Sequence, residues 1–61
     1  MLAKPGLRFE HARVLGPDNR PAAYIVTRVA QGVVWYRQAD ERKAKEYCPV
    51  DEFPRIVGKT L

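Results

Sequence analysis

The sequence predicts a mainly β protein, either a small SH3-like barrel or a strongly curved antiparallel sheet with a short C-terminal helix. Two runs of β-branched and aromatic residues flank Gln31-Gly32, a typical tight turn. A turn-rich stretch precedes these runs, and an apolar helical stripe follows them. A chain of 61 residues has a small core, and a barrel or curved sheet is one of the few ways to protect its strand edges. We therefore expect a single domain, residues 1–61.

The first three strands follow from alternation and from turn residues. Residues 7–15 alternate loosely between apolar and polar side chains and predict the first strand. The Gly, Pro, Asp and Asn residues of 16–21 predict a loop that closes a hairpin. Residues 22–30 and 33–38 predict the second and third strands, and Gly32 between them can adopt positive φ.

The C-terminal third is harder to assign. Ala, Glu, Lys and Arg in 39–46 favour a helix, whereas the short length and the neighbouring strands favour a polar loop that enters a short strand at 45–48. We prefer the loop and strand. Asp51 as N-cap, the apolar spacing within 53–57 and Gly58 after the last turn predict a short helix.

A two-residue turn fixes which residues of the central hairpin face each other, and it places Arg28 opposite Trp35. The charge-free face belongs in the core, because burying an unpaired charge is costly. That face holds Ile25, Thr27, Val29, Val34 and Tyr36, and the outer face holds Tyr24, Val26, Arg28, Ala30, Val33, Trp35 and Arg37. The expected core is Phe9, Ile25, Val29, Val34, Tyr36, Cys48, Phe53, Ile56 and Val57.

The single tryptophan is the centre of the candidate binding surface. An aromatic ring between guanidinium groups suits nucleic-acid bases and phosphates, or a protein partner. Two alternatives stay open: Trp35 stacks under Arg28 and Arg37 as a cation–π lid, or a different turn length buries it. The candidate site residues are Trp35, Arg28, Arg37, Tyr24, Arg8 and Arg13.

Few residues are available for catalysis or metal binding. The sequence has no serine, one cysteine and one histidine, so a serine nucleophile and an internal disulfide are excluded, and too few soft ligands remain for structural zinc. We interpret Cys48 as a buried inert thiol and His11 as a surface strand residue. We therefore expect no enzymatic activity, no cofactor and no metal.

The charge balance favours an anionic partner. The net charge is +4 and is spread along the chain. No apolar run reaches the ~20 residues of a membrane span, residues 1–6 lack the features of a signal peptide, and a single cysteine fits the cytoplasm. The expected function is nucleic-acid binding, with DNA foremost; the alternative is a protein-interaction module. A homo-oligomer is compatible with either function.

Several short motifs carry a resemblance. They are Pro5-Gly6, residues 24–29, residues 34–37, and Tyr47-Cys48-Pro49 with Phe53. Their order resembles that of short phage and prophage proteins of unknown function with an SH3-like small barrel, although the loop at 16–21 is longer here. The resemblance implies a β domain encoded by mobile DNA, and a protein partner would then be a host protein or a larger complex. The chain is also similar in plan to small archaeal chromatin proteins, which bind duplex DNA with an exposed sheet.

Overall fold

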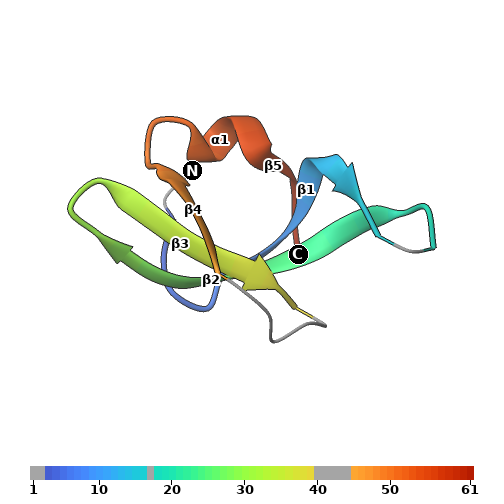
Figure 1. Ribbon diagram of the computed structural model, residues 1–61, viewed down its shortest axis with the longest axis horizontal. Helices are drawn as coiled ribbons and strands as arrows, with labels where there is room; N and C mark the ends of the chain where they lie inside the picture. Colours follow the sequence, from blue (N-terminus) through green and yellow to red (C-terminus); the bar gives the residue numbers. More distant parts are fainter. Residues whose placement is uncertain (1–2, 17, 40–44) are drawn as a thin grey trace.

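Five strands form one antiparallel sheet in the order β4-β3-β2-β1-β5 (Figure 1). The computed structural model describes residues 3–16, 18–39 and 45–61. The elements are β1 (Arg8–Leu15), β2 (Pro21–Ala30), β3 (Val33–Gln38), β4 (Glu46–Pro49), α1 (Phe53–Ile56) and β5 (Val57–Thr60). The sheet is mainly built from neighbours in sequence, and only β5 crosses over to reach β1.

The mainly β fold with a short C-terminal helix is confirmed, in its curved-sheet form. Strands β4 and β5 are the two edges, and no ladder joins them within the described part of the chain. The sheet curls so that both edges rise on the same side, and α1 lies between them (Figure 1). The concave side of the sheet is therefore covered by α1, and the convex side is the outer face.

The central hairpin has the predicted turn. Gln31 and Gly32 both have positive φ, 52° and 74°, which is the geometry of the turns that match the twist of a two-stranded ribbon. The turn sets Ala30 opposite Val33 and Arg28 opposite Trp35, as the sequence predicts.

A β-bulge changes the register beyond Arg28. Val26, not Thr27, lies opposite Tyr36, so that Thr27 is an extra residue in β2. The predicted facing is therefore wrong for the first half of β2. Tyr24 and Val26 point into the core, where Tyr24 is 2% exposed, and Ile25 lies half-buried on the outer face.

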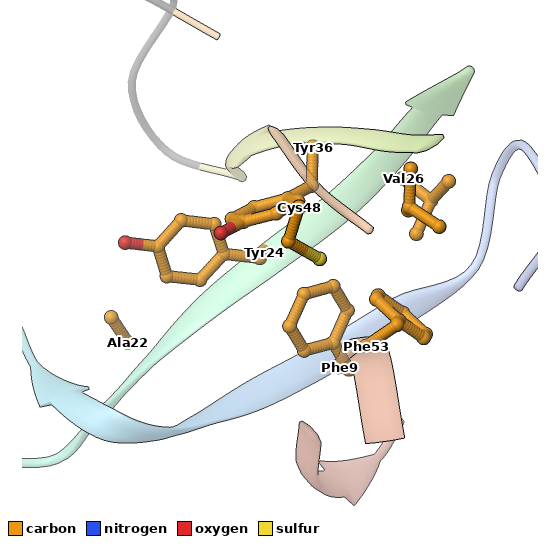
Figure 2. Close-up of a cluster of buried hydrophobic side chains, with 8 residues drawn as sticks. Phe9, Ala22, Tyr24, Val26, Tyr36, Cys48 and Phe53 are labelled. Atoms are coloured by element: carbon orange, nitrogen blue, oxygen red, sulfur yellow. The ribbon is translucent and has the colours of Figure 1, made fainter. Parts of the chain in front are cut away.

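The core is an aromatic cluster centred on Phe9 (Figure 2). The ring centroid of Phe9 lies 5.7 Å from that of Tyr24, 5.9 Å from Tyr36 and 5.2 Å from Phe53. These rings come from β1, β2, β3 and α1, so the cluster joins the sheet to its helix. The buried apolar residues are Phe9, Ala22, Tyr24, Val26, Val34, Tyr36, Cys48 and Phe53.

The expected core is confirmed in its larger part. Phe9, Val34, Tyr36, Cys48 and Phe53 are buried. The partly buried Val29, Ile56 and Val57 pack against these residues. Only Ile25 belongs to the outer face, because the bulge at Thr27 turns it away from the cluster.

His11 is buried, which corrects its assignment to the surface. Its side chain is 9% exposed, and its ring centroid lies 5.3 Å from that of Tyr24. Its Nδ1 accepts a hydrogen bond of 3.0 Å from the backbone N–H of Arg13. Burial lowers the pKa of His11, Glu46 opposes this shift, and Arg13 adds to it.

The C-terminal region contains a strand that the sequence pattern does not reveal. Helix α1 begins after Glu52, which makes no side-chain cap, so the predicted capping role of Asp51 is wrong. Gly58 does not end the helix but lies in β5, after the extended Val57. A Cβ at Gly58 would lie 3.2 Å from the carbonyl oxygen of Glu10, so glycine permits the close approach of β5 to β1.

The short strand expected at 45–48 is confirmed as β4, one residue further along. The choice between helix and loop for residues 39–46 stays a prediction, because residues 40–44 lie outside the described residues.

Two alanine variants test the facing of the sheet. We expect Tyr36→Ala to lower the free energy of unfolding by ~3 kcal/mol or more, because it removes a buried ring from the aromatic cluster. Ile25→Ala removes a half-buried side chain from the outer face and serves as the control with a smaller loss. Urea denaturation measures both, and equal losses would contradict the facing described here.

Protonation of His11 should make the folded protein less stable as the pH decreases. Its pKa is lowered from 6.5 in the folded state, so the unfolded chain binds the proton more readily. The stability is fully present above 6.5 and decreases as the pH falls from 6.5 towards the lowered folded pKa. His11→Gln cannot titrate, so urea midpoints of this variant should change less across the same window. An equally steep loss in both proteins would assign the effect to other groups.

Candidate nucleic-acid interface

Two rows of side chains cross the outer face of the sheet. Arg28 on β2 pairs with Trp35 on β3, and Trp35 pairs with Tyr47 on β4. We call these three residues the tryptophan row. Arg8 on β1 pairs with Ile25 on β2, and Ile25 pairs with Arg37 on β3; these form the arginine row. Trp35 and Arg37 are two residues apart on one strand, so the two rows are neighbours.

Trp35 lies half-buried under an arginine. The Cζ atom of Arg28 lies 5.1 Å from the centre of the indole, within the range of a cation–π contact. Thr27, the extra residue of the bulge, donates from Oγ1 to the carbonyl oxygen of Trp35 at 3.4 Å. The cation–π interpretation is thus confirmed for Arg28, and the interpretation of Trp35 as a fully buried residue is wrong.

Arg37 has a different partner. Its Nη1 donates to the backbone carbonyl oxygen of Gln38 at 3.2 Å, and the side chain is half-buried. This contact holds the guanidinium near the β3 strand. A guanidinium has five N–H donors, so one bond to a carbonyl leaves several N–H groups for an external acceptor.

A shallow pocket adjoins the indole. It has a volume of about 170 Å³ and is lined by Thr27, Arg28, Trp35 and Lys45. This volume is below the ~300–1,000 Å³ typical of small-molecule sites. Two cations beside an aromatic wall suit a small anion such as one phosphate group of a polymer.

The charge of the two rows is entirely positive among the described residues. Arg8, Arg28 and Arg37 lie in the rows, and Lys45 lines the pocket. Glu46 pairs with the inward-facing Tyr36 and acts on the pKa values of Tyr36 and His11, so its carboxylate belongs to the other face. Glu10 lies on the outer face next to the arginine row, two residues from Arg8 on β1, and it pairs with Lys59 of β5.

Four of the six predicted site residues come together. Trp35, Arg28, Arg37 and Arg8 occupy the two rows. Tyr24 does not belong to the surface, because the bulge turns its ring into the core.

Arg13 is exposed but lies five residues from Arg8 along β1, up to ~16 Å away at the usual rise of a strand. A register irregularity also separates Arg13 from Arg8. Arg13 is therefore not part of the two rows.

Sequence reasoning missed two residues of this face. Tyr47 is 71% exposed, the most exposed of the large apolar side chains of the described residues, and Lys45 lines the pocket. Both flank the start of β4. The pairing of β4 with β3 places both residues on this face. The sequence does not predict the register of that pairing, because the length of the loop before β4 is not set by any local pattern.

Burial shifts the pKa values of two titratable side chains in the core, Cys48 and Tyr36. Burial raises the pKa of the Cys48 thiol, with a smaller contribution from Glu52, and burial raises the pKa of Tyr36 to about 12. A protonated, buried thiol is a weak nucleophile. Residues 3–16, 18–39 and 45–61 contain no group of three or more His, Cys, Asp or Glu side chains placed to hold a metal ion.

Within the same ranges, no helix has both the length and the apolar character needed to cross a membrane. No protein family, curated protein or solved structure matches the chain. The resemblance to short phage proteins therefore stays a prediction.

The Cys48 thiol should react slowly in the folded protein. A raised pKa and burial both lower the supply of accessible thiolate, so a disulfide reagent at neutral pH should modify Cys48 much faster in urea than in buffer. The rate of thiol modification, followed by absorbance, checks this expectation. Rapid reaction without denaturant would show that the β4 edge opens readily.

Proposed function

We propose that this domain is a non-enzymatic nucleic-acid-binding module, with DNA as the foremost ligand, and that it binds through the outer face of its sheet. The observation that carries the proposal is the tryptophan row, in which an aromatic pair lies beside a guanidinium. Neither this row nor the arginine row contains an acidic residue. Stacking surfaces and cations together are what a polynucleotide requires of a protein.

Electrostatics support a phosphate ligand. Arg8, Arg28, Arg37 and Lys45 concentrate positive charge on one side of a chain whose net charge is only +4. Each phosphate neutralised by these side chains releases condensed counterions, which favours binding at low salt. Arginine also makes paired hydrogen bonds to phosphate oxygens.

A protein partner is the second candidate, and the exposure of Tyr47 supports it. Tyrosine, tryptophan and arginine are also the residue types that dominate protein-protein interfaces. The two candidates differ in salt dependence, because an apolar contact centred on Trp35 and Tyr47 would not weaken steeply as counterions are added.

Titration of a labelled DNA oligonucleotide at two salt concentrations tests the proposal. Trp35→Ala should weaken binding about tenfold or more, because stacking contributes ~1–3 kcal/mol per base and 1.4 kcal/mol is a factor of ten. Arg28→Gln and Arg37→Gln should each weaken binding and reduce the slope of log K against log salt by about one unit.

Arg55→Gln is the matched control, since Arg55 is an exposed arginine on α1, away from the outer face. It removes the same charge and should change affinity little. Equal effects of Arg55→Gln and Arg28→Gln would indicate a response to net charge alone. The absence of salt-dependent binding to DNA or RNA would overturn the proposal in favour of a protein partner.

A further inference from the structure

We infer that the ligand of this face is a single-stranded polynucleotide, with successive bases stacked on Trp35 and Tyr47. The inference rests on the proposed function and adds the class of nucleic acid. It arises from the position of Tyr47 beside Trp35, which the register of β3 and β4 establishes.

We call the paired residues Trp35 and Tyr47, on β3 and β4, the platform. Directly paired residues on one face of an antiparallel sheet have Cβ atoms ~4.5–5.5 Å apart. Trp35 and Tyr47 are such a pair, and both side chains rise from the outer face. Because the two side chains start this close together, each ring can take one base of a strand whose bases are turned towards the protein.

Tyr47 has no structural role that explains its position. It lies on an edge strand, its side chain is 71% exposed, and it is outside the aromatic cluster that builds the core. An aromatic ring that is mostly exposed keeps a face free for stacking, and the position of Tyr47 places this ring between Trp35 and the β4 edge of the sheet. A free ring face next to Trp35 is a surface for stacking.

A duplex cannot use this platform as a single strand can. Bases within a double helix are stacked on each other and present only their edges in the grooves. Unpaired bases present their faces, and proteins that bind them combine aromatic side chains with a cationic path for the backbone. The tryptophan row supplies rings on a sheet face that extends to the β4 edge, and not a protruding helix or ribbon that would enter a major groove.

The cations near the platform are placed to contact the phosphate backbone of one strand. Arg28 lies at one end of the tryptophan row, and Arg37 is two residues from Trp35 on β3. Lys45 lines the pocket against the indole and is two residues from Tyr47 in sequence. Phosphates on both sides of two stacked bases would therefore meet a cation, and the Arg28 and Lys45 pocket offers a place for one of them.

The test compares ligands whose bases are free, paired or missing. We would titrate a single-stranded oligothymidylate of about 12 nucleotides, an oligouridylate of the same length, a DNA duplex of that length and an abasic deoxyribose-phosphate strand. Trp35 is the only tryptophan, so quenching of its fluorescence reports stacking directly. We expect at least one of the two single strands to bind about tenfold or more tighter than the duplex and the abasic strand, and to quench Trp35.

Variants of Tyr47 separate stacking from charge. Tyr47→Ala should weaken binding of the preferred single strand about tenfold and leave duplex affinity unchanged, whereas Tyr47→Phe keeps the ring and should keep the affinity. Both variants should fold, because the side chain is exposed. Circular dichroism and the urea midpoint check this.

The outcomes distinguish the two proposals. Equal affinity for duplex and single strand, or no loss on Tyr47→Ala, would overturn the inference and leave nucleic-acid binding by this face intact. No salt-dependent binding to any of the four ligands would overturn both. The ratio of oligothymidylate to oligouridylate affinity reports the combined effect of the sugar and of the thymine methyl group, and either preference supports the inference.

Discussion

The β-bulge at Thr27 is the constraint on which both faces of the sheet depend. Without an extra residue, strict alternation would place Tyr24 and Val26 on the same side as Arg28. The bulge instead lets β2 bury Tyr24 and Val26 in its first half and still direct Arg28 outward against Trp35. One inserted residue therefore supplies the core with a ring and the outer face with a cation from the same strand. Bulges also increase local twist, which fits the curl of this short sheet.

The core and the outer face divide the polar chemistry of the chain between them. Burial lowers the pKa of His11 and raises the pKa values of Cys48 and Tyr36, so all three groups are held in their neutral forms near pH 7. Charge remains outside, where Arg8, Arg28 and Arg37 lie at paired positions of neighbouring strands. A chain of 61 residues has a small core, and in it Phe9 contacts Tyr24, Tyr36 and Phe53.

The structure could be predicted from the sequence where neighbouring residues alone determine the backbone geometry. Gln31-Gly32 forces a two-residue turn, so the pairing of Arg28 with Trp35 followed from local geometry. The bulge at Thr27 has no such signal, because threonine suits a regular strand equally well. The charge-free criterion failed for the same reason: Tyr24, Ile25 and Val26 are all uncharged, so composition could not tell which of them is buried. Strand β5 escaped notice because glycine there serves a close approach of two backbones, which only the folded chain reveals. The position of Tyr47 in the candidate site depends on the register between β3 and β4, which no short sequence pattern determines.

The contact between Arg28 and Trp35 stabilises the free protein little compared with what the same groups can contribute to binding. A cation–π pair at an exposed site is worth ~0.5–1 kcal/mol, whereas stacking of one base on an aromatic side chain is worth ~1–3 kcal/mol. A base that stacks on the indole beside the guanidinium can therefore contribute more than the cation–π contact itself. The Cζ atom of Arg28 lies 5.1 Å from the indole centre, so the guanidinium is already beside the ring in the free protein. Because ordering a flexible side chain at an interface costs ~0.5–1.5 kcal/mol, an arginine that is held on the indole in the free state reduces the cost of forming the complex.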